Sequence, residues 1–303
     1  MKFSVILLTY NSAVEAIKRT MESIINQVFD DFELLIADDG SKNFPEEEVR
    51  EFLSENGFTS YQMILNKENR GTIKNYISAI EAAQGKFIKV IGAGDLLYDE
   101  NVISSIYDFL STGEYKLGFG LMRSFYWDEG YKFKDEIFAP RDISPYIKQN
   151  YKKIKRNLFL CRDYICGASL FGEREYLKEY LYQMSKRAVY LEDYATLLMV
   201  RDGGKIGFLD RFVVYYESNS GVSTKKGSSA NERLLKDSAH CWETIAAESD
   251  SWILKRNIYG QRRAPQIKNK LVRIVYRLLY TPHFFLQVGK REVRSGANGF
   301  LER

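Results

Sequence analysis

The chain has 303 residues, 45% of them hydrophobic and 28% charged, as is ordinary for a globular protein of one large domain or a domain with an appendage. The formal net charge of +4 is unevenly distributed, because residues 255–303 carry twelve Lys and Arg against two Glu. The preceding 254 residues hold 32 basic and 38 acidic side chains. A basic nucleic-acid groove on this larger part is disfavoured, so we expect no nucleic-acid partner.

Cysteine usage and hydropathy indicate the compartment. The three cysteines, Cys161, Cys166 and Cys241, follow no metal-binding spacing, which favours free thiols in a reducing cytoplasm. The apolar run after Met1 is too short for a signal peptide and is typical of a strand. No run reaches the roughly 18 apolar residues that span a bilayer. We therefore expect a cytoplasmic protein without a transmembrane segment.

The first hundred residues alternate between strand and helix patterns. Residues 2–11 (KFSVILLTYN) and 32–41 (FELLIADDGS) are short apolar runs that end abruptly in polar residues, which is typical of central strands in a parallel sheet. Further strands are predicted at 61–65 and 87–91, and helices at 13–26, from Pro45 onward and at 72–83. Four strand–helix units with short connections predict a doubly wound α/β fold.

The remainder of the chain is less regular. The pattern predicts helices at 100–110, 173–184 and 191–201, strands at 115–126, 164–171 and 206–217, and further helices from Asn231 onward. Residues 127–157 are polar and aromatic, as expected of a substrate-facing segment or of a plain surface excursion. The G-x-G-x-x-G fingerprint is missing after the first strand, so an NAD-binding Rossmann domain is disfavoured.

Six stretches of the chain form a set whose order is specific. They are SVILLTYN, NQVFDDFELLIADDGS, NRGTIKN, the Gly94-Asp95 turn, LEDYATLLMVRDGGKIGFLDRFVVYY and SGVST. Together they resemble the family 2 inverting glycosyltransferases of the GT-A fold. The resemblance implies a catalytic domain at 1–225 with a Rossmann-like, mainly parallel sheet flanked by helices. Residues 226–303 are then expected to form a helical, basic C-terminal extension.

A nucleotide site is predicted at the carboxyl ends of the first two strands. An aromatic ring such as that of Tyr10 can stack on a pyrimidine, and Asp39 can accept a hydrogen bond from a ring N–H. The resemblance implies that Thr9, Tyr10, Asn11 and the two acids of ADDGS contact the nucleotide. For Asp38 and Asp39, a strand-end turn or a helix cap remains an alternative.

The turn after the third predicted strand is the next candidate for nucleotide binding. Asn69, Arg70 and Gly71 stand at this turn, with Lys74 one helical turn later. An arginine beside a helix N-terminus suits anionic groups such as a diphosphate. A solvated turn with charges on the helix face explains the same residues equally well.

The turn GAGD at 92–95 corresponds to the acidic motif of the family. The resemblance implies that Asp95 binds a divalent cation, Mg²⁺ or Mn²⁺, and that Gly94 lies at the nucleotide. Such ions take oxygen ligands from one or two carboxylates and from the substrate phosphates. Gly92 and Gly94 stand where acids are common in the family, so we expect looser metal binding.

The acidic pair Glu192-Asp193 begins a predicted helix. The resemblance implies that Asp193 is the general base, which removes the proton from the attacking acceptor hydroxyl, with Glu192 beside it. Acids at a helix N-terminus are also favoured by the helix dipole alone, which is the structural alternative.

The C-terminal region predicts a membrane contact. Over 267–288, aliphatic residues at helical spacing alternate with Lys and Arg, and Pro282 ends the pattern before Phe284 and Phe285. Basic amphipathic helices of this kind lie in the interface of anionic membranes. A helix that packs back on the domain with a solvated charged face is the alternative.

The resemblance, together with the basic C-terminal pattern, implies an inverting glycosyltransferase that acts as a peripheral protein at the inner face of the cell membrane. It is expected to use a nucleotide-sugar donor, most simply a UDP-sugar, and a lipid-linked or oligosaccharide acceptor in cell-surface glycan synthesis. Two alternatives remain: a catalytically silent nucleotide-binding partner in a glycan-assembly complex, and a sugar-phosphate nucleotidyltransferase. A nucleotidyltransferase would carry a Gly-rich phosphate loop after the first strand, and this sequence has no such loop there.

Overall fold

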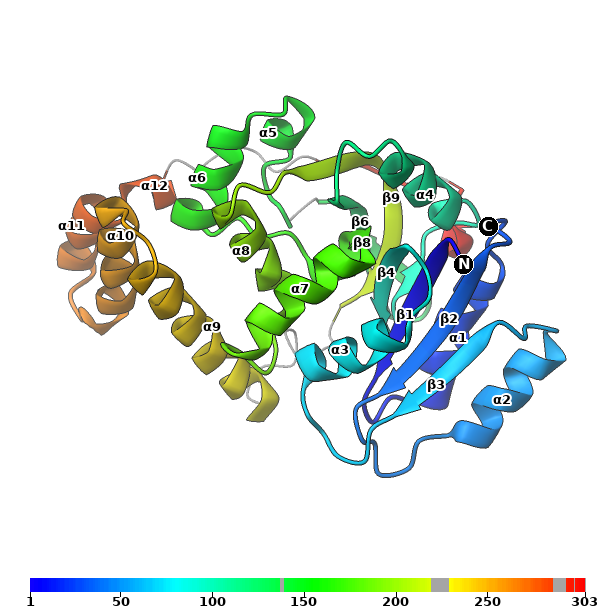
Figure 1. The fold of residues 1–303 in the computed structure, drawn as a ribbon. Helices are drawn as coiled ribbons and strands as arrows, with labels where there is room; N and C mark the ends of the chain where they lie inside the picture. Colours follow the sequence, from blue (N-terminus) through cyan, green and yellow to red (C-terminus); the bar gives the residue numbers. More distant parts are fainter. Residues whose placement is uncertain (137–138, 219–228, 286–292, 297, 303) are drawn as a thin grey trace.

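The computed structural model describes residues 1–303 except 137–138, 219–228, 286–292, 297 and 303 (Figure 1). The SGVST motif and the domain boundary expected at 225/226 therefore lie outside the described residues. The first half of the chain contains β1 (Phe3–Thr9), α1 (Val14–Ile25), β2 (Phe32–Asp38), α2 (Glu46–Glu55), β3 (Tyr61–Leu65), α3 (Thr72–Ala82), β4 (Phe87–Gly92), β5 (Leu96–Leu97) and α4 (Val102–Ser111).

The second half continues with β6 (Leu117–Trp127), β7 (Tyr131–Lys134), α5 (Ser144–Ile147), α6 (Tyr151–Cys161), β8 (Leu170–Glu173), α7 (Arg174–Ser185), the 3-10 turn η2 (Glu192–Tyr194), α8 (Ala195–Arg201) and β9 (Ile206–Glu217). Two expectations were wrong here. Residues 127–157, for which no helix or strand was expected, contain β7, α5 and the first turns of α6, where Ile154 is buried. The strand expected at 164–171 begins only at Leu170, after a 3-10 turn over Gly167–Ser169.

The strands of the described residues form one sheet in the order β3-β2-β1-β4-β8-β6-β9-β5, with β7 paired to β6. β3, β2, β1, β4, β6 and β9 run in the same direction, whereas β8, β5 and β7 run opposite to them. The expected mainly parallel, doubly wound sheet is therefore present. β1 pairs with β2 on one side and β4 on the other, so the three strands end at the same edge.

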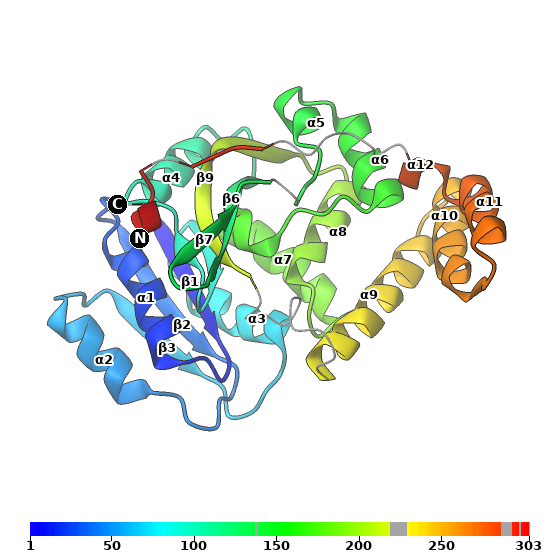
Figure 2. The ribbon, with the colours of Figure 1, turned by 180° about the vertical axis from the view of Figure 1, so that it is seen from behind.

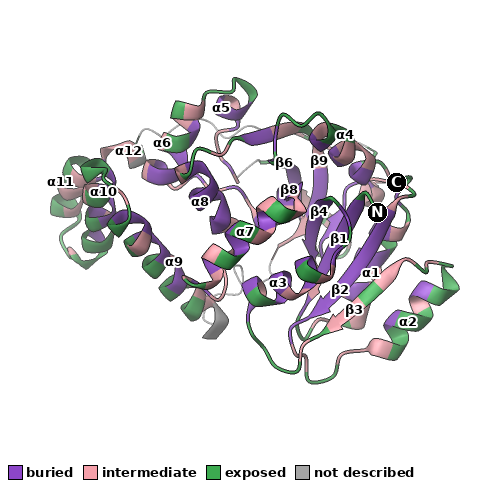
Figure 3. Ribbon diagram, viewed as in Figure 1, coloured by how far each residue is buried: buried purple, intermediate pink, exposed green. Residues whose placement is uncertain are grey.

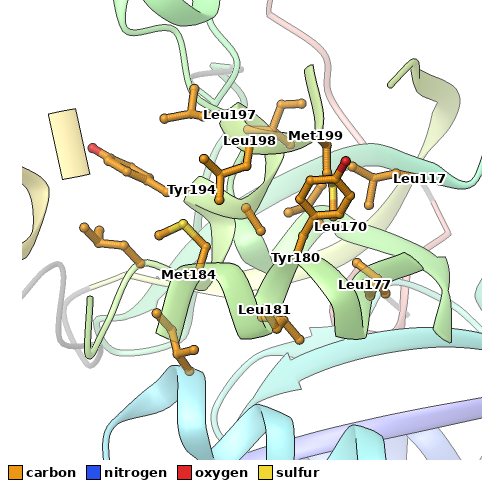
Figure 4. Close-up of a cluster of buried hydrophobic side chains, with 14 of the residues drawn as sticks. Leu117, Leu170, Leu177, Tyr180, Leu181, Met184, Tyr194, Leu197, Leu198 and Met199 are labelled. Carbon is orange, nitrogen blue, oxygen red and sulfur yellow. The ribbon is translucent and has the colours of Figure 1, made fainter. Parts of the chain in front are cut away.

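Two hydrophobic clusters cover the two faces of the sheet, which is the most buried part of the molecule (Figure 3). One cluster holds the inner faces of α1 and α4, and the other those of α3, α7 and α8. In the second cluster, side chains of α8 such as Leu198 meet Leu181 and Met184 of α7 (Figure 4). This packing anchors α8, and with it the turn that carries the acidic pair.

Beyond the sheet, α9 (Ser229–Ala247), α10 (Trp252–Arg263), α11 (Lys270–Tyr280) and α12 (Pro282–Phe285) project to one side (Figure 1). None of the helices in the described ranges is long and apolar enough to cross a membrane. The chain then returns to the sheet, so that its two ends lie near each other in both views (Figures 1 and 2). There the carboxylate of Glu302 accepts hydrogen bonds from Tyr98 and Tyr215.

Candidate active site

A cleft of about 670 Å³ opens at the carboxyl ends of β1 and β4. Its walls come from the residues that follow β1, the first turns of α1, the end of β4, residues 166–168, residues 190–193 and the end of β9. Segments far apart in the sequence thus meet where the parallel strands end, which is the usual place for a ligand in an open α/β sheet.

The base of the cleft is organised by Asp38, the last residue of β2. Its carboxylate accepts hydrogen bonds from Thr9 Oγ1 at 2.8 Å and from the backbone N–H and hydroxyl of Ser41 at 2.7 and 2.6 Å. The Ser41 hydroxyl in turn accepts from the backbone N–H of Asn11. Thr9, Tyr10 and Asn11 line the cleft, while Asp38 lies beneath them and ties the ends of β1 and β2 together.

Asp39 lines the cleft and also fixes the loop after β3. Its two carboxylate oxygens accept hydrogen bonds from the backbone N–H groups of Arg70 and Gly71, both at 2.8 Å. Burial raises the pKa of Asp39, and the two N–H donors oppose this rise. Each oxygen retains a second lone pair, so Asp39 can still accept a hydrogen bond from a ligand.

Two tyrosines border the same end of the cleft. Tyr10 is 48% exposed, which leaves its ring free to stack on a planar group. Tyr190 lies within electrostatic range of both Tyr10 and Asp39, and its pKa is raised chiefly by burial. The backbone N–H of Tyr190 donates to Asp237 of α9, so α9 helps to hold this side of the cleft.

The loop after β3 supports the cleft from outside. Asn69, Arg70, Gly71 and Lys74 are not among the lining residues of this cleft, although Arg70 and Gly71 bind Asp39 through their backbone. Gly71 has a φ of +85°, and a Cβ there would lie 2.1 Å from the Val189 side chain. Only glycine therefore allows this loop to approach the segment that precedes the acidic pair.

The acidic pair lies in the cleft wall on the 3-10 turn η2. Leu191, just before it, has a φ of +72°, which is strained for a branched residue and is the kind of strain that clusters at functional sites. Burial raises the pKa of Glu192, and burial together with the charge of Glu192 raises that of Asp193 well above its usual value. A Cβ on Gly167 would lie 2.7 Å from Glu192 Oε1, so that glycine makes room for the carboxylate.

Asp95 also lines the cleft, in the turn between β4 and β5. Its Oδ1 accepts a hydrogen bond from the backbone N–H of Glu217 at 2.8 Å. Burial raises the pKa of Asp95 to about 7, and the Glu217 N–H and the cation of Lys89 oppose this rise. Lys89 is fully buried, donates to the carbonyls of Val90 and Ala168, and has its pKa lowered to about 8 by burial.

Among the charged residues that line the cleft, the sequence analysis missed two. Glu217, at the end of β9, forms an ion pair with Arg19 of α1 at 3.6 Å. Glu217 could have been found as an acid at the carboxyl end of a predicted strand, but nothing in the sequence near Arg19 marks it as a site residue.

Gly94, which was expected at the nucleotide, is not among the lining residues of the cleft and has a φ of +104°.

Comparison with known proteins identifies the family of the chain. The sequence profile of Glycosyl transferase family 2 matches residues 4–181, more than half of the chain. The chain therefore belongs to glycosyl transferase family 2.

Two uncharacterized glycosyltransferases are similar over shorter stretches. One from Mycoplasma pneumoniae is 28% identical over 118 residues, and one from Methanocaldococcus jannaschii is 32% identical over 94 residues. These matches cover 39% and 31% of this chain and span only 39% and 32% of the relatives' own lengths.

Solved structures show the same fold at low sequence identity. S. aureus TarS 1–349 in complex with UDP-GlcNAc has a TM-score of 0.61 and 17% identity, over 95% of this chain and 82% of that one. The mannosyltransferase PcManGT of Pyrobaculum calidifontis, in complex with GDP-Man and Mn²⁺, has a TM-score of 0.58 and 13% identity. This match covers 94% of the present chain and 84% of the PcManGT chain. The fold is that of the GT-A glycosyltransferases.

The contact between Gly71 and Val189 predicts a specific loss of stability. Gly71→Ala should lower the free energy of unfolding in urea by about 1–3 kcal/mol more than Gly57→Ala, because the new methyl group is overpacked against Val189. Gly57 is a matched control, since it also has a positive φ, +66°, but nothing lies within 4 Å of its Cβ position. Equal losses in the two variants would contradict this packing.

Proposed function

We propose that this chain transfers a sugar, with inversion, from a UDP-sugar to a hydroxyl of a lipid-linked or oligosaccharide acceptor in cell-surface glycan synthesis. The observation that carries the proposal is that the acidic pair Glu192-Asp193 shares one cleft with the nucleotide-binding candidates Tyr10 and Asp39. A base and a donor platform in the same cleft are what a single displacement at an anomeric carbon requires.

Uracil is the base that best suits the end of the cleft at Tyr10. The Tyr10 ring offers a stacking surface, and Asp39 can accept a hydrogen bond from the uracil ring N–H while its oxygens hold the loop at Arg70 and Gly71. The similar proteins bind nucleotide sugars of two kinds, UDP-GlcNAc in TarS and GDP-Man in PcManGT. The pairing of Tyr10 with Asp39 favours the uridine donor.

A divalent cation, Mg²⁺ or Mn²⁺, fits the residues at Asp95. Asp95 is 9% exposed, lines the cleft and has one carboxylate oxygen, Oδ2, to which none of the described residues donates a hydrogen bond. Carboxylate oxygens are among the ligands that these hard cations prefer. When bound, the ion would stabilise the negative charge on the departing nucleoside diphosphate.

The chemical step then depends on Asp193. Its carboxylate accepts the proton of the acceptor hydroxyl as that oxygen attacks the anomeric carbon. The new C–O bond forms as the bond from the anomeric carbon to the diphosphate breaks, and UDP leaves with the electron pair. Burial first, and then the charge of Glu192, raises the pKa of Asp193 and so makes it a stronger base at the moment of proton transfer.

Replacing the base gives the direct test of this function. Asp193→Asn should lower the rate of sugar transfer at least about 100-fold, which is the scale of general base catalysis, while UDP binding persists. Transfer is measured with a panel of UDP-sugars, and binding by thermal stabilisation with UDP and Mn²⁺. The matched control is Asp108→Asn, an exposed acid on α4 that should leave both unchanged. Wild-type transfer by Asp193→Asn would refute its role as the base.

The raised pKa of Asp193 predicts the pH dependence of transfer. The base must be deprotonated, so the rate should rise as the pH rises through the elevated pKa. Glu192→Gln removes the neighbouring charge, which lowers the pKa of Asp193 and should move this rising limb to lower pH. Single-turnover rates at saturating donor, measured across pH, report the shift. A limb that stays in place in Glu192→Gln would show that Glu192 does not tune the base.

We further propose that the protein acts as a peripheral protein at the cytoplasmic face of the membrane, which it contacts through α11. This helix buries none of its residues, although it packs beside α10 through Tyr259 and Tyr280. Its exposed aliphatic side chains are Leu271, Val272, Ile274, Val275, Leu278 and Leu279, and Lys268, Lys270, Arg273 and Arg277 accompany them. An apolar face bordered by cations matches an anionic lipid surface.

Vesicle binding tests this placement. The double variant Leu271→Gln/Leu278→Gln should bind phosphatidylglycerol–phosphatidylcholine vesicles about tenfold more weakly than the wild-type chain, because two apolar side chains no longer enter the interface. Co-sedimentation measures the binding, with pure phosphatidylcholine vesicles showing the contribution of charge. Leu235→Gln is the control, since Leu235 is 62% exposed, between Leu271 at 74% and Leu278 at 51%, but lies on α9. Unchanged binding by the double variant would exclude α11 as the contact.

A further inference from the structure

The acidic motif of this chain retains only one of its acids, Asp95, because positions 92 and 94 are glycines. β5 follows Asp95 immediately and pairs antiparallel with β9, with Leu96 opposite Tyr215. Continuing this register by two residues brings Gly94 opposite Glu217. The hydrogen bond from the Glu217 N–H to Asp95 Oδ1, at 2.8 Å, agrees with this alignment.

The Glu217 carboxylate fills the space that a side chain at position 94 would need. A Cβ built on Gly94 would lie 2.3 Å from Glu217 Oε2 and 3.3 Å from its carboxyl carbon. An acid at position 94 and the present position of Glu217 are therefore mutually exclusive. A carboxylate is thus present at this point of the cleft, but it comes from β9 rather than from the motif.

The electrostatic surroundings leave oxygens available to a cation. Glu217 Oε1 pairs with Arg19 Nη2 at 3.6 Å, while Oε2 has no hydrogen-bond partner among the described residues. Asp95, nine-tenths buried, has its Oδ2 without such a partner as well. Two carboxylates therefore border the same cleft, and Arg19 forms an ion pair on the Glu217 side.

We propose that Glu217 provides the second carboxylate of the divalent cation site, in place of the acid absent from position 94. The inference rests on the proposed function, since the substrate diphosphate completes the coordination of the ion. Hard cations such as Mg²⁺ and Mn²⁺ are commonly held by one or two carboxylates plus substrate phosphates, so Asp95 and Glu217 suffice on the protein side. Arg19 then remains at the edge of the site, paired with Glu217 Oε1.

Direct Mn²⁺ binding tests this assignment without requiring an acceptor. Mn²⁺ is titrated into the protein at saturating UDP, and free Mn²⁺ is counted by electron paramagnetic resonance, with UDP alone as background. Glu217→Gln, which keeps the shape of the side chain, should weaken Mn²⁺ binding about tenfold or more. The control Glu51→Gln, an exposed acid on α2, should leave it unchanged. Thermal unfolding confirms that each variant is folded.

Arg19→Met separates a metal ligand from a residue that merely holds Arg19. If Glu217 is a ligand, Arg19→Met keeps or strengthens Mn²⁺ binding, because a competing cation is removed. If Arg19→Met weakens Mn²⁺ binding as much as Glu217→Gln does, Glu217 acts only through Arg19 and the inference is wrong. A wild-type Mn²⁺ affinity in Glu217→Gln would also overturn the assignment of Glu217 as a metal ligand. If that variant still transfers sugar, the proposed function is unaffected.

Discussion

The pairing of β1 with both β2 and β4 is the constraint on which the site depends. β1 is almost wholly buried, so its hydrogen bonds must be satisfied by strands on both sides, and the register makes all three strands end at one edge. Thr9 therefore lies opposite Asp38, and Gly92 lies opposite Leu8, one residue earlier. The hydrogen bond from Thr9 to Asp38 then fixes the floor of the cleft.

The cleft concentrates negative charge, and backbone N–H groups and a buried lysine compensate part of it. Asp39 is held by two backbone N–H groups, Asp95 by one N–H group and the nearby cation of Lys89. In the pair Glu192-Asp193, burial raises both pKa values and the charge of Glu192 raises that of Asp193 further, although backbone N–H groups oppose the rise. Carboxylates that remain partly uncompensated favour ligands that bring positive charge or protons, which is how such sites are recognised.

Much of the fold follows from local pattern. The strands at 61–65 and 206–217 were predicted with the bounds that the structure has, because each is an apolar run between clear turn signals. The helix α6 was missed although its buried residues have helical spacing, since its many Lys and Arg side chains obscure the apolar stripe. The strand expected at 164–171 was wrong because Gly167 and its neighbours form a turn that makes room for Glu192.

By itself, the sequence determined the alternation of strands and helices and the placing of Tyr10, Asp39 and Asp95 after strands. Those features depend on apolar periodicity and on polar residues that end each run, both of which are local. Only the tertiary structure decided that the loop at Arg70 supports the cleft from outside and that Glu217 stands at Gly94. The contact of Glu217 with Gly94 joins segments more than 100 residues apart through the pairing of β5 with β9, and neither strand alone determines the register between them.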